Sequence, residues 1–133
     1  MRFFADLEGS QSVPPVDTSA NGDAVLTVNQ NQTQVSYRIN VNSLQRMTVA
    51  HIHLGRRGQN GPIIAPLLSV SPAISVTRAQ VMGSISQSDL TGPLQGQSLA
   101  DLIENMNAGN TYVNVHTEQH PEGEIRGQIR RVD

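Results

Sequence analysis

The stretch AVLTVNQNQTQVSYRINV (residues 24–41) alternates apolar and polar side chains on both sides of a short polar segment at residues 29–33. The apolar positions are Ala24, Leu26, Val28, Val35, Tyr37, Ile39 and Val41. Alternation with a period of two is typical of a half-buried strand. Two such runs joined by a short polar turn predict a β-hairpin with one face toward the core.

The same alternation recurs outward from this hairpin in both directions. The further β segments are expected at residues 2–8, 48–54, 63–70, 81–85, 111–117 and 124–132, the last two joined by a Pro/Gly turn at 121–123. Turn residues separate these segments at regular intervals. The predicted fold is therefore all-β: an antiparallel β-sandwich of the immunoglobulin/superoxide-dismutase-like type, with seven or eight strands and one short helix.

The one expected helix begins after Ser98 and ends at Gly109. Ser98 is suited to the N-cap, Asp101 lies in the first turn, and glycine commonly ends a helix. Its apolar stripe consists of Leu99, Leu102, Ile103 and Met106. Such a stripe predicts a helix packed on a sheet or closing one end of it.

The composition narrows the class of protein. The chain has 133 residues, of which 37% are apolar, and this size fits one domain spanning residues 1–133. A formal charge of −2 predicts neither nucleic-acid binding nor attraction to anionic membranes, and no apolar run is long enough for a membrane span. The absence of cysteine excludes disulfides, cysteine zinc sites and thiol catalysis. Because the first strand is expected to begin at Arg2, a signal peptide has no room before it. The chain is then either cytosolic or the mature form of a longer one.

All four histidines lie in two short segments, His51-Ile52-His53 and residues 116–120. Successive side chains of a strand point to opposite faces. His51 and His53 therefore share one face, and the apolar residues that flank them share the other. Because the apolar set should face the core, both imidazoles are expected to project together from the outer side of the sheet.

The terminal hairpin obeys the same rule. A register that buries Ile125 places His116 on the same face as Glu124 and Arg126. The resulting polar patch consists of Asn114, His116, Glu124, Arg126 and Gln128. If the strand that carries His51 lies beside this hairpin, the two groups of polar side chains merge.

This arrangement is typical of a metal site. His51 and His53 offer two ligands to one ion, and His116 or His120 can supply a third or fourth. Glu118 and Glu124 are candidate carboxylate ligands or hydrogen-bond partners of the ligands. Without thiolate donors, copper and zinc are the favoured ions, and nickel is also compatible. The predicted metal ligands are His51, His53, His116, His120 and Glu124.

Two other interpretations stay open. The histidines can be structural hydrogen-bond partners around Arg126, in a protein-interaction or structural module without metal. A metal-dependent oxidoreductase needs a general acid or base, for which Glu124 and Tyr112 are weak candidates, and no catalytic residue is assigned. The glycine-rich segment 55–62 lacks the ending of a phosphate-binding loop, and no serine lies in a hydrolase motif.

Several motifs, taken in order, resemble those of the CHRD (chordin-type) domain family. They are Phe3-x-Ala5-x-Leu7, Val13-Pro14-Pro15-Val16, Ala50-His51-Ile52-His53-x-Gly55, Asn60-Gly61-Pro62, Gly109-x-Thr111-Tyr112-Val113-Asn114-Val115-His116-Thr117 and Pro121-x-Gly123-Glu124-Ile125-Arg126-Gly127-Gln128. The resemblance runs from about Arg2 to Ile129, so the whole chain is expected to be one CHRD domain of the single-domain bacterial type.

This resemblance implies a β-sandwich module that works outside the cytosol, whether secreted, periplasmic or at the cell surface. In chordin such modules belong to a secreted antagonist of bone morphogenetic proteins, so an extracellular protein partner is also expected. The His-x-His strand is similar to the copper-binding strand of Cu/Zn superoxide dismutase, another β-sandwich. The bridging histidine and zinc-binding aspartate of that enzyme have no match here, so we expect a binding module rather than an enzyme.

Overall fold

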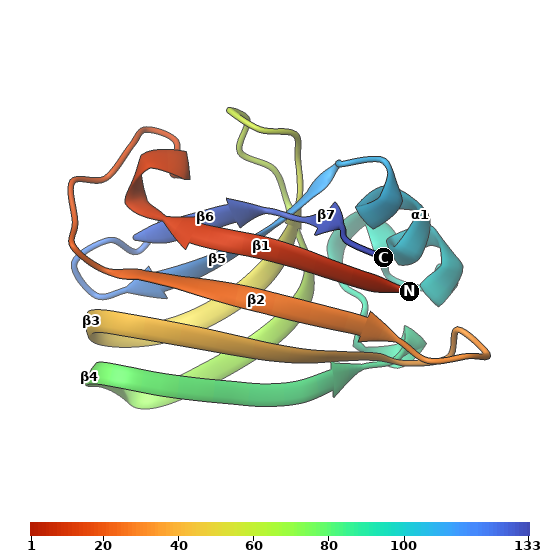
Figure 1. Ribbon diagram of the computed structural model, residues 1–133, viewed down its shortest axis with the longest axis horizontal. Helices are drawn as coiled ribbons and strands as arrows, with labels where there is room; N and C mark the ends of the chain where they lie inside the picture. Colours follow the sequence, from red (N-terminus) through yellow and green to blue (C-terminus); the bar gives the residue numbers. More distant parts are fainter.

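The computed structural model describes residues 1–133, which form seven antiparallel strands and one α-helix (Figure 1). The strands are β1 (Arg2–Glu8), β2 (Asn21–Val28), β3 (Val35–Leu54), β4 (Ile63–Ile85), β5 (Thr111–Thr117), β6 (Ile125–Gln128) and β7 (Arg130–Arg131). The helix α1 covers Leu99–Asn107, and three single 3-10 turns are η1 (Gly9–Gln11), η2 (Gln87–Asp89) and η3 (Gly92–Leu94).

Five of the strands close into a barrel. Their order is β2, β1, β6, β5 and β3, and β3 pairs back with β2. Outside the barrel, β4 pairs with β3 and β7 pairs with β1. The predicted antiparallel all-β fold with one short helix is confirmed, but a single sheet closed on itself takes the place of the two packed sheets. Sandwiches and barrels both alternate inward and outward side chains, so the sequence pattern alone does not separate them.

Strand β3 permits this closure because it bends. Its interior positions lie two residues apart near both ends of the strand and three apart in the middle. The middle positions are Val41, Leu44, Met47 and Ala50. Each longer step adds one residue to the outer side, as a β-bulge does, and the register with β4 shifts between Leu44 and Val49. The first part of β3 thus pairs with β2 and the last part with β5, where sequence analysis expected two separate strands.

The barrel interior is filled by one cluster of 28 buried apolar residues. The predicted hairpin is present, with Val28 paired to Val35 and Ala24 to Ile39. Its turn is stabilised by Asn29, whose Oδ1 accepts hydrogen bonds from the N–H groups of Thr33 and Gln34. The predicted stripe of α1 is buried, although the Ser98 side chain makes no capping hydrogen bond. No helix of the chain has the length and apolar character needed to cross a membrane.

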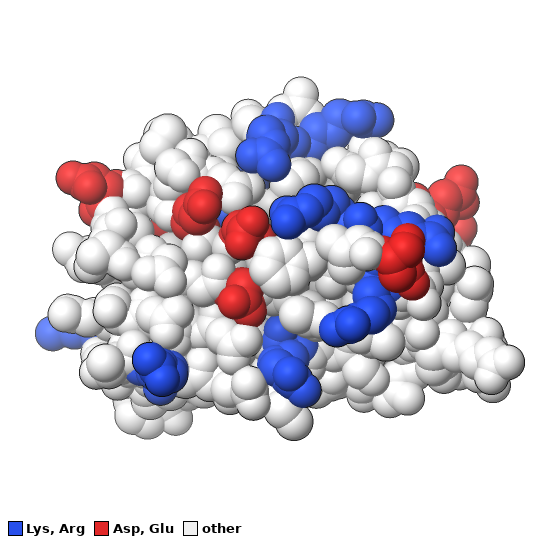
Figure 2. Space-filling model, viewed as in Figure 1, with Lys and Arg blue, Asp and Glu red and all other residues white.

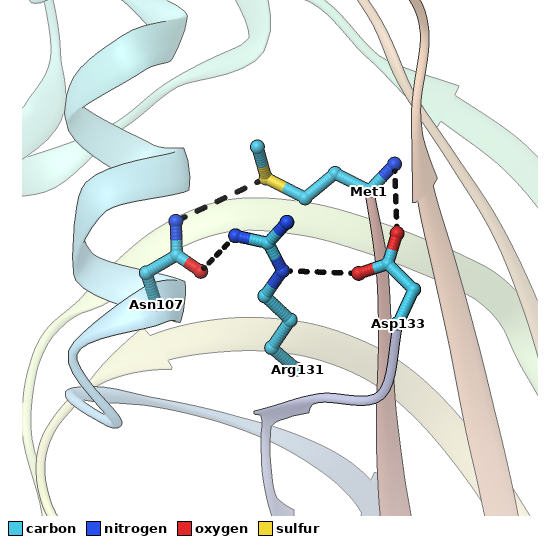
Figure 3. Close-up of polar contacts among 4 residues, drawn as sticks. All are labelled: Met1, Asn107, Arg131 and Asp133. Atoms are coloured by element: carbon cyan, nitrogen blue, oxygen red, sulfur yellow. Dashed lines mark hydrogen bonds and ion pairs between the residues drawn. The ribbon is translucent and has the colours of Figure 1, made fainter.

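Helix α1 lies at the end of the barrel where the two chain termini meet (Figure 1). There the Met1 amino group lies 3.1 Å and the Arg131 Nε 3.0 Å from the Asp133 carboxylate, and Arg131 also reaches Asn107 (Figure 3). A hydrogen bond from the Arg2 backbone, together with the Arg131 and Met1 contacts, lowers the pKa of Asp133 to about 2. Arginine and acidic side chains both occur on the face of β1 and β2 (Figure 2), in keeping with the small net charge.

Candidate metal site

Three of the four histidines meet on the outer face of β3 and β5. The pairing of these strands places His51 opposite Asn114 and His53 opposite Tyr112, and His116 follows Asn114 by two residues. Residues directly opposite in an antiparallel pair share a face of the sheet. One ring nitrogen from each of His51, His53 and His116 lies within 4.8 Å of the other two. The structure thus shows the shared face that the alternation predicted, and it adds the adjacency to His116, which the alternation had left open.

Two backbone carbonyls determine which nitrogens face the centre of this three-histidine cluster. The Nδ1 atom of His53 lies 2.8 Å from the carbonyl oxygen of Gly61, and Nδ1 of His116 lies 2.6 Å from that of Pro121. A carbonyl oxygen only accepts, so each Nδ1 must carry the hydrogen. In the neutral rings, Nε2 of His53 and of His116 therefore presents a lone pair. Metal-binding histidines are commonly oriented in this way, by a second N–H donated to a carbonyl.

The distances within the cluster suit a single ion. Nδ1 of His51 lies 3.4 Å from Nε2 of His116. Two nitrogens bound to one tetrahedral zinc at about 2.0–2.1 Å are about 3.3 Å apart. Nε2 of His53 is buried and has no hydrogen-bond partner. A cation among the rings would give that lone pair a partner, and imidazole nitrogen is a preferred donor for zinc and copper.

Burial also favours the neutral form of two of these imidazoles, those of His51 and His53. Burial, followed by the proximity of His116 and His53, lowers the pKa of His51 to about 4. Burial also lowers the pKa of His53; the nearby His116 and Arg126 act in the same direction, and the hydrogen bond to Gly61 opposes them. Because a metal binds the deprotonated ring, neutral imidazoles at pH 7 need to lose no proton before binding.

A buried arginine and a tyrosine support one side of the cluster. The Tyr112 ring stacks on His53 with 4.9 Å between centroids, and the Arg126 guanidinium lies 3.5 Å from the Tyr112 ring centroid. Arg126 projects from the outer face of β6 as predicted, yet it is only 1% exposed. The glycine-rich segment 55–62 covers it: Arg126 donates to the carbonyl oxygen of Arg56 at 2.9 Å and to Oδ1 of Asn60 at 3.3 Å.

The other two predicted ligands lie outside the cluster. Glu124 is buried, and its carboxylate accepts hydrogen bonds from the hydroxyls of Thr18 at 2.7 Å and Thr117 at 2.9 Å. His120 lies in the turn after β5, where its backbone hydrogen-bonds to Thr117. Because β5 ends at Thr117, the chain turns away before His120, and closeness in sequence to His116 does not bring its ring into the cluster.

Sequence reasoning missed the groups that orient the ligands. Asn114 was expected only as a member of a polar patch, yet its register position lies among the three histidines. The carbonyls of Gly61 and Pro121 belong to loops, and no side-chain pattern marks a backbone acceptor. The glycine and proline residues of those loops predicted turns, but they did not predict that the carbonyl oxygens would accept hydrogen bonds from the histidine rings.

Two comparisons with known proteins bear on this chain. The family described as the CHRD domain matches residues 3–129. Chordin from Danio rerio is similar as well, with 31% identity over 123 residues, which cover 92% of this chain. The matched region spans only 12% of that chordin's own length.

Proposed function

This chain belongs to the CHRD domain family, and from that premise we propose that it is a binding module that holds one transition-metal ion, copper or zinc. The ligands are His51, His53 and His116, a smaller set than the sequence suggested. The observation that carries this proposal is the pair of hydrogen bonds from the Nδ1 atoms of His53 and His116 to carbonyls, which leave the Nε2 lone pair of each ring free within a cluster whose ligand atoms lie within 4.8 Å of one another.

The role that suits this site is binding for storage, delivery or structure. Three protein nitrogens leave at least one coordination position of zinc or copper open. Catalysis would also need a general acid or base beside the metal, and the cluster itself contains only the three histidines. Binding alone needs nothing further.

The test is a calorimetric titration of chelator-treated protein with Cu(II) and with Zn(II), on protein made without a histidine tag. We expect one site tighter than micromolar for at least one ion. The double variant His51→Ala/His53→Ala should lose it, because one imidazole cannot hold the ion. His120→Ala is the matched control and should bind as the parent does. No site tighter than micromolar, or unchanged binding by the double variant, would refute the proposal.

A second candidate function is a metal-free interaction or structural module, and the same hydrogen bonds favour it. His53 and His116 tie the loops at Gly61 and Pro121 to the sheet. In this case His116→Ala should lower the free energy of unfolding equally in chelator and in metal. A metal site instead predicts that added metal stabilises the parent protein and not the variant.

The expected location outside the cytosol is part of this proposal, as is an extracellular protein partner. Both rest on the CHRD family and on the similarity to chordin. Fractionation of cells that express the native gene checks the location, and recovery in the cytosolic fraction would contradict it.

A further inference from the structure

We propose that the metal carries a fourth, exchangeable ligand, a water molecule that donates a hydrogen bond to Oδ1 of Asn114, and that small anions bind by replacing this water. The inference rests on the metal site proposed above. It adds a ligand class, small anions, and a residue, Asn114, that governs their access.

The first support is the position of Asn114. Asn114 lies directly opposite His51 on the neighbouring strand β3. On its own strand it lies two residues before His116 and two residues after Tyr112, which is opposite His53. Its side chain therefore occupies the outer-face position between the three histidines. The residue is only 4% exposed, and its amide group lies against Glu122 and Gly123 of the turn that follows β5.

The second support is an unpaired atom. Nδ2 of Asn114 donates to the carbonyl oxygen of Glu122 at 3.3 Å, and a carbonyl cannot donate in return. The orientation of the amide is thereby determined, and Oδ1 is the atom left over. Oδ1 is buried without any hydrogen-bond partner, as is Nε2 of His53. A metal with bound water satisfies both atoms at once, because the ion takes the lone pair and the water supplies the missing donor.

The third support is charge. Three neutral imidazoles leave the full charge of a divalent ion uncompensated, and the buried charged side chain beside them, Arg126, is a cation. The Glu124 carboxylate is held by two threonine hydroxyls and does not join the ligands. A compensating anion must therefore come from solvent. It can approach past His51, which is the more exposed of the three ligands.

Azide bound to Cu(II) is the probe, because it gives a ligand-to-metal charge-transfer absorption and has no hydrogen to donate. In the parent protein, azide must displace a water held by Oδ1. Asn114→Ala removes that hydrogen bond, so we expect azide to bind about fivefold more tightly. Copper affinity should change by less than about threefold, since the three imidazoles remain. Asn42→Ala, at a half-buried position of β3 outside the three-histidine cluster, is the control and should not change the azide affinity.

A second variant keeps the test open if Asn114→Ala fails to fold. Asn114→Asp has nearly the same shape, and its negative charge should weaken azide binding at least about tenfold. Azide affinities that are the same in the parent and both variants would overturn this inference, as would a copper-loaded parent that takes up no azide. Those results leave the proposed metal site intact. Absence of copper and zinc binding in the parent would overturn both.

Discussion

Nδ1 of His53 lies 2.8 Å from the carbonyl oxygen of Gly61, so the loop that follows β3 determines which nitrogen of a candidate ligand faces the site. The same loop receives support in return, because the N–H of Gly61 donates to the Tyr112 hydroxyl at 3.1 Å. The loop and the three-histidine cluster are thus joined by two hydrogen bonds, so a change in the loop should alter the orientation of the His53 ring.

Gly61→Ala is expected to impair metal binding without touching a ligand. A Cβ at this position would collide with the backbone oxygen of Leu54, so the loop must move. We expect a loss of roughly 1–3 kcal/mol in the free energy of unfolding and about 10- to 100-fold in metal affinity, typical of a lost second N–H partner. Urea unfolding and metal titration measure both. Gly58→Asn is the control, since a side chain there meets nothing and asparagine tolerates its φ of 84°; an equal loss of affinity in this control would count against the link.

Arg126→Met should destabilise the domain strongly, although arginine is usually a surface residue. The change leaves the carbonyl oxygen of Arg56 without its donor and removes the stacking on Tyr112. We expect the free energy of unfolding to fall by about 2–4 kcal/mol. Arg126→Lys should not restore the parent stability, because an ammonium group lacks the planar fork. Arg46→Met, whose side chain is 71% exposed, is the control and should change stability by less than about 1 kcal/mol; equal effects at positions 46 and 126 would refute this account.

Acid should destabilise the metal-free protein as the pH falls from about 6.5 toward 4. The pKa of His51 is lowered from 6.5 to about 4 in the folded protein, mainly by burial. Between these values the unfolded chain binds a proton that the folded chain does not, so the free energy of unfolding decreases as pH decreases. Urea unfolding in chelator at several pH values measures the slope. His51→Gln should have a shallower slope over this range, and a slope equal to that of the parent would contradict the assignment.

Glu124→Ala tests whether the Glu124 carboxylate is a structural hydrogen-bond acceptor or a metal ligand. Removal of the carboxylate leaves the buried Thr117 hydroxyl without its acceptor. We therefore expect a loss of about 2 kcal/mol in the free energy of unfolding. Metal affinity should stay within about threefold of the parent value, since the three histidines are intact. A loss of affinity as large as that of His116→Ala would instead place Glu124 among the ligands.

The sequence by itself determined the strands and the faces of their side chains. Ala50 and Ile52 are apolar and had to be buried, so His51 and His53 had to point the other way. This conclusion needs only the backbone geometry of a strand and the free energy of burying apolar groups, and both act locally. The terminal hairpin and the helical stripe were predicted for the same reason.

Only the tertiary structure decided which of these faces became a site. His51 and His116 are 65 residues apart, and their contact depends on β3 pairing with β5 in a sheet that closes on itself. The same closure, together with the loop at 55–62, buried Arg126 and supplied the carbonyl that orients His53. Alternation along one strand carries no information about its neighbours, since long-range pairing is selected by the packing of the whole core. For that reason His120 and Glu124, close to His116 in sequence, lie outside the cluster.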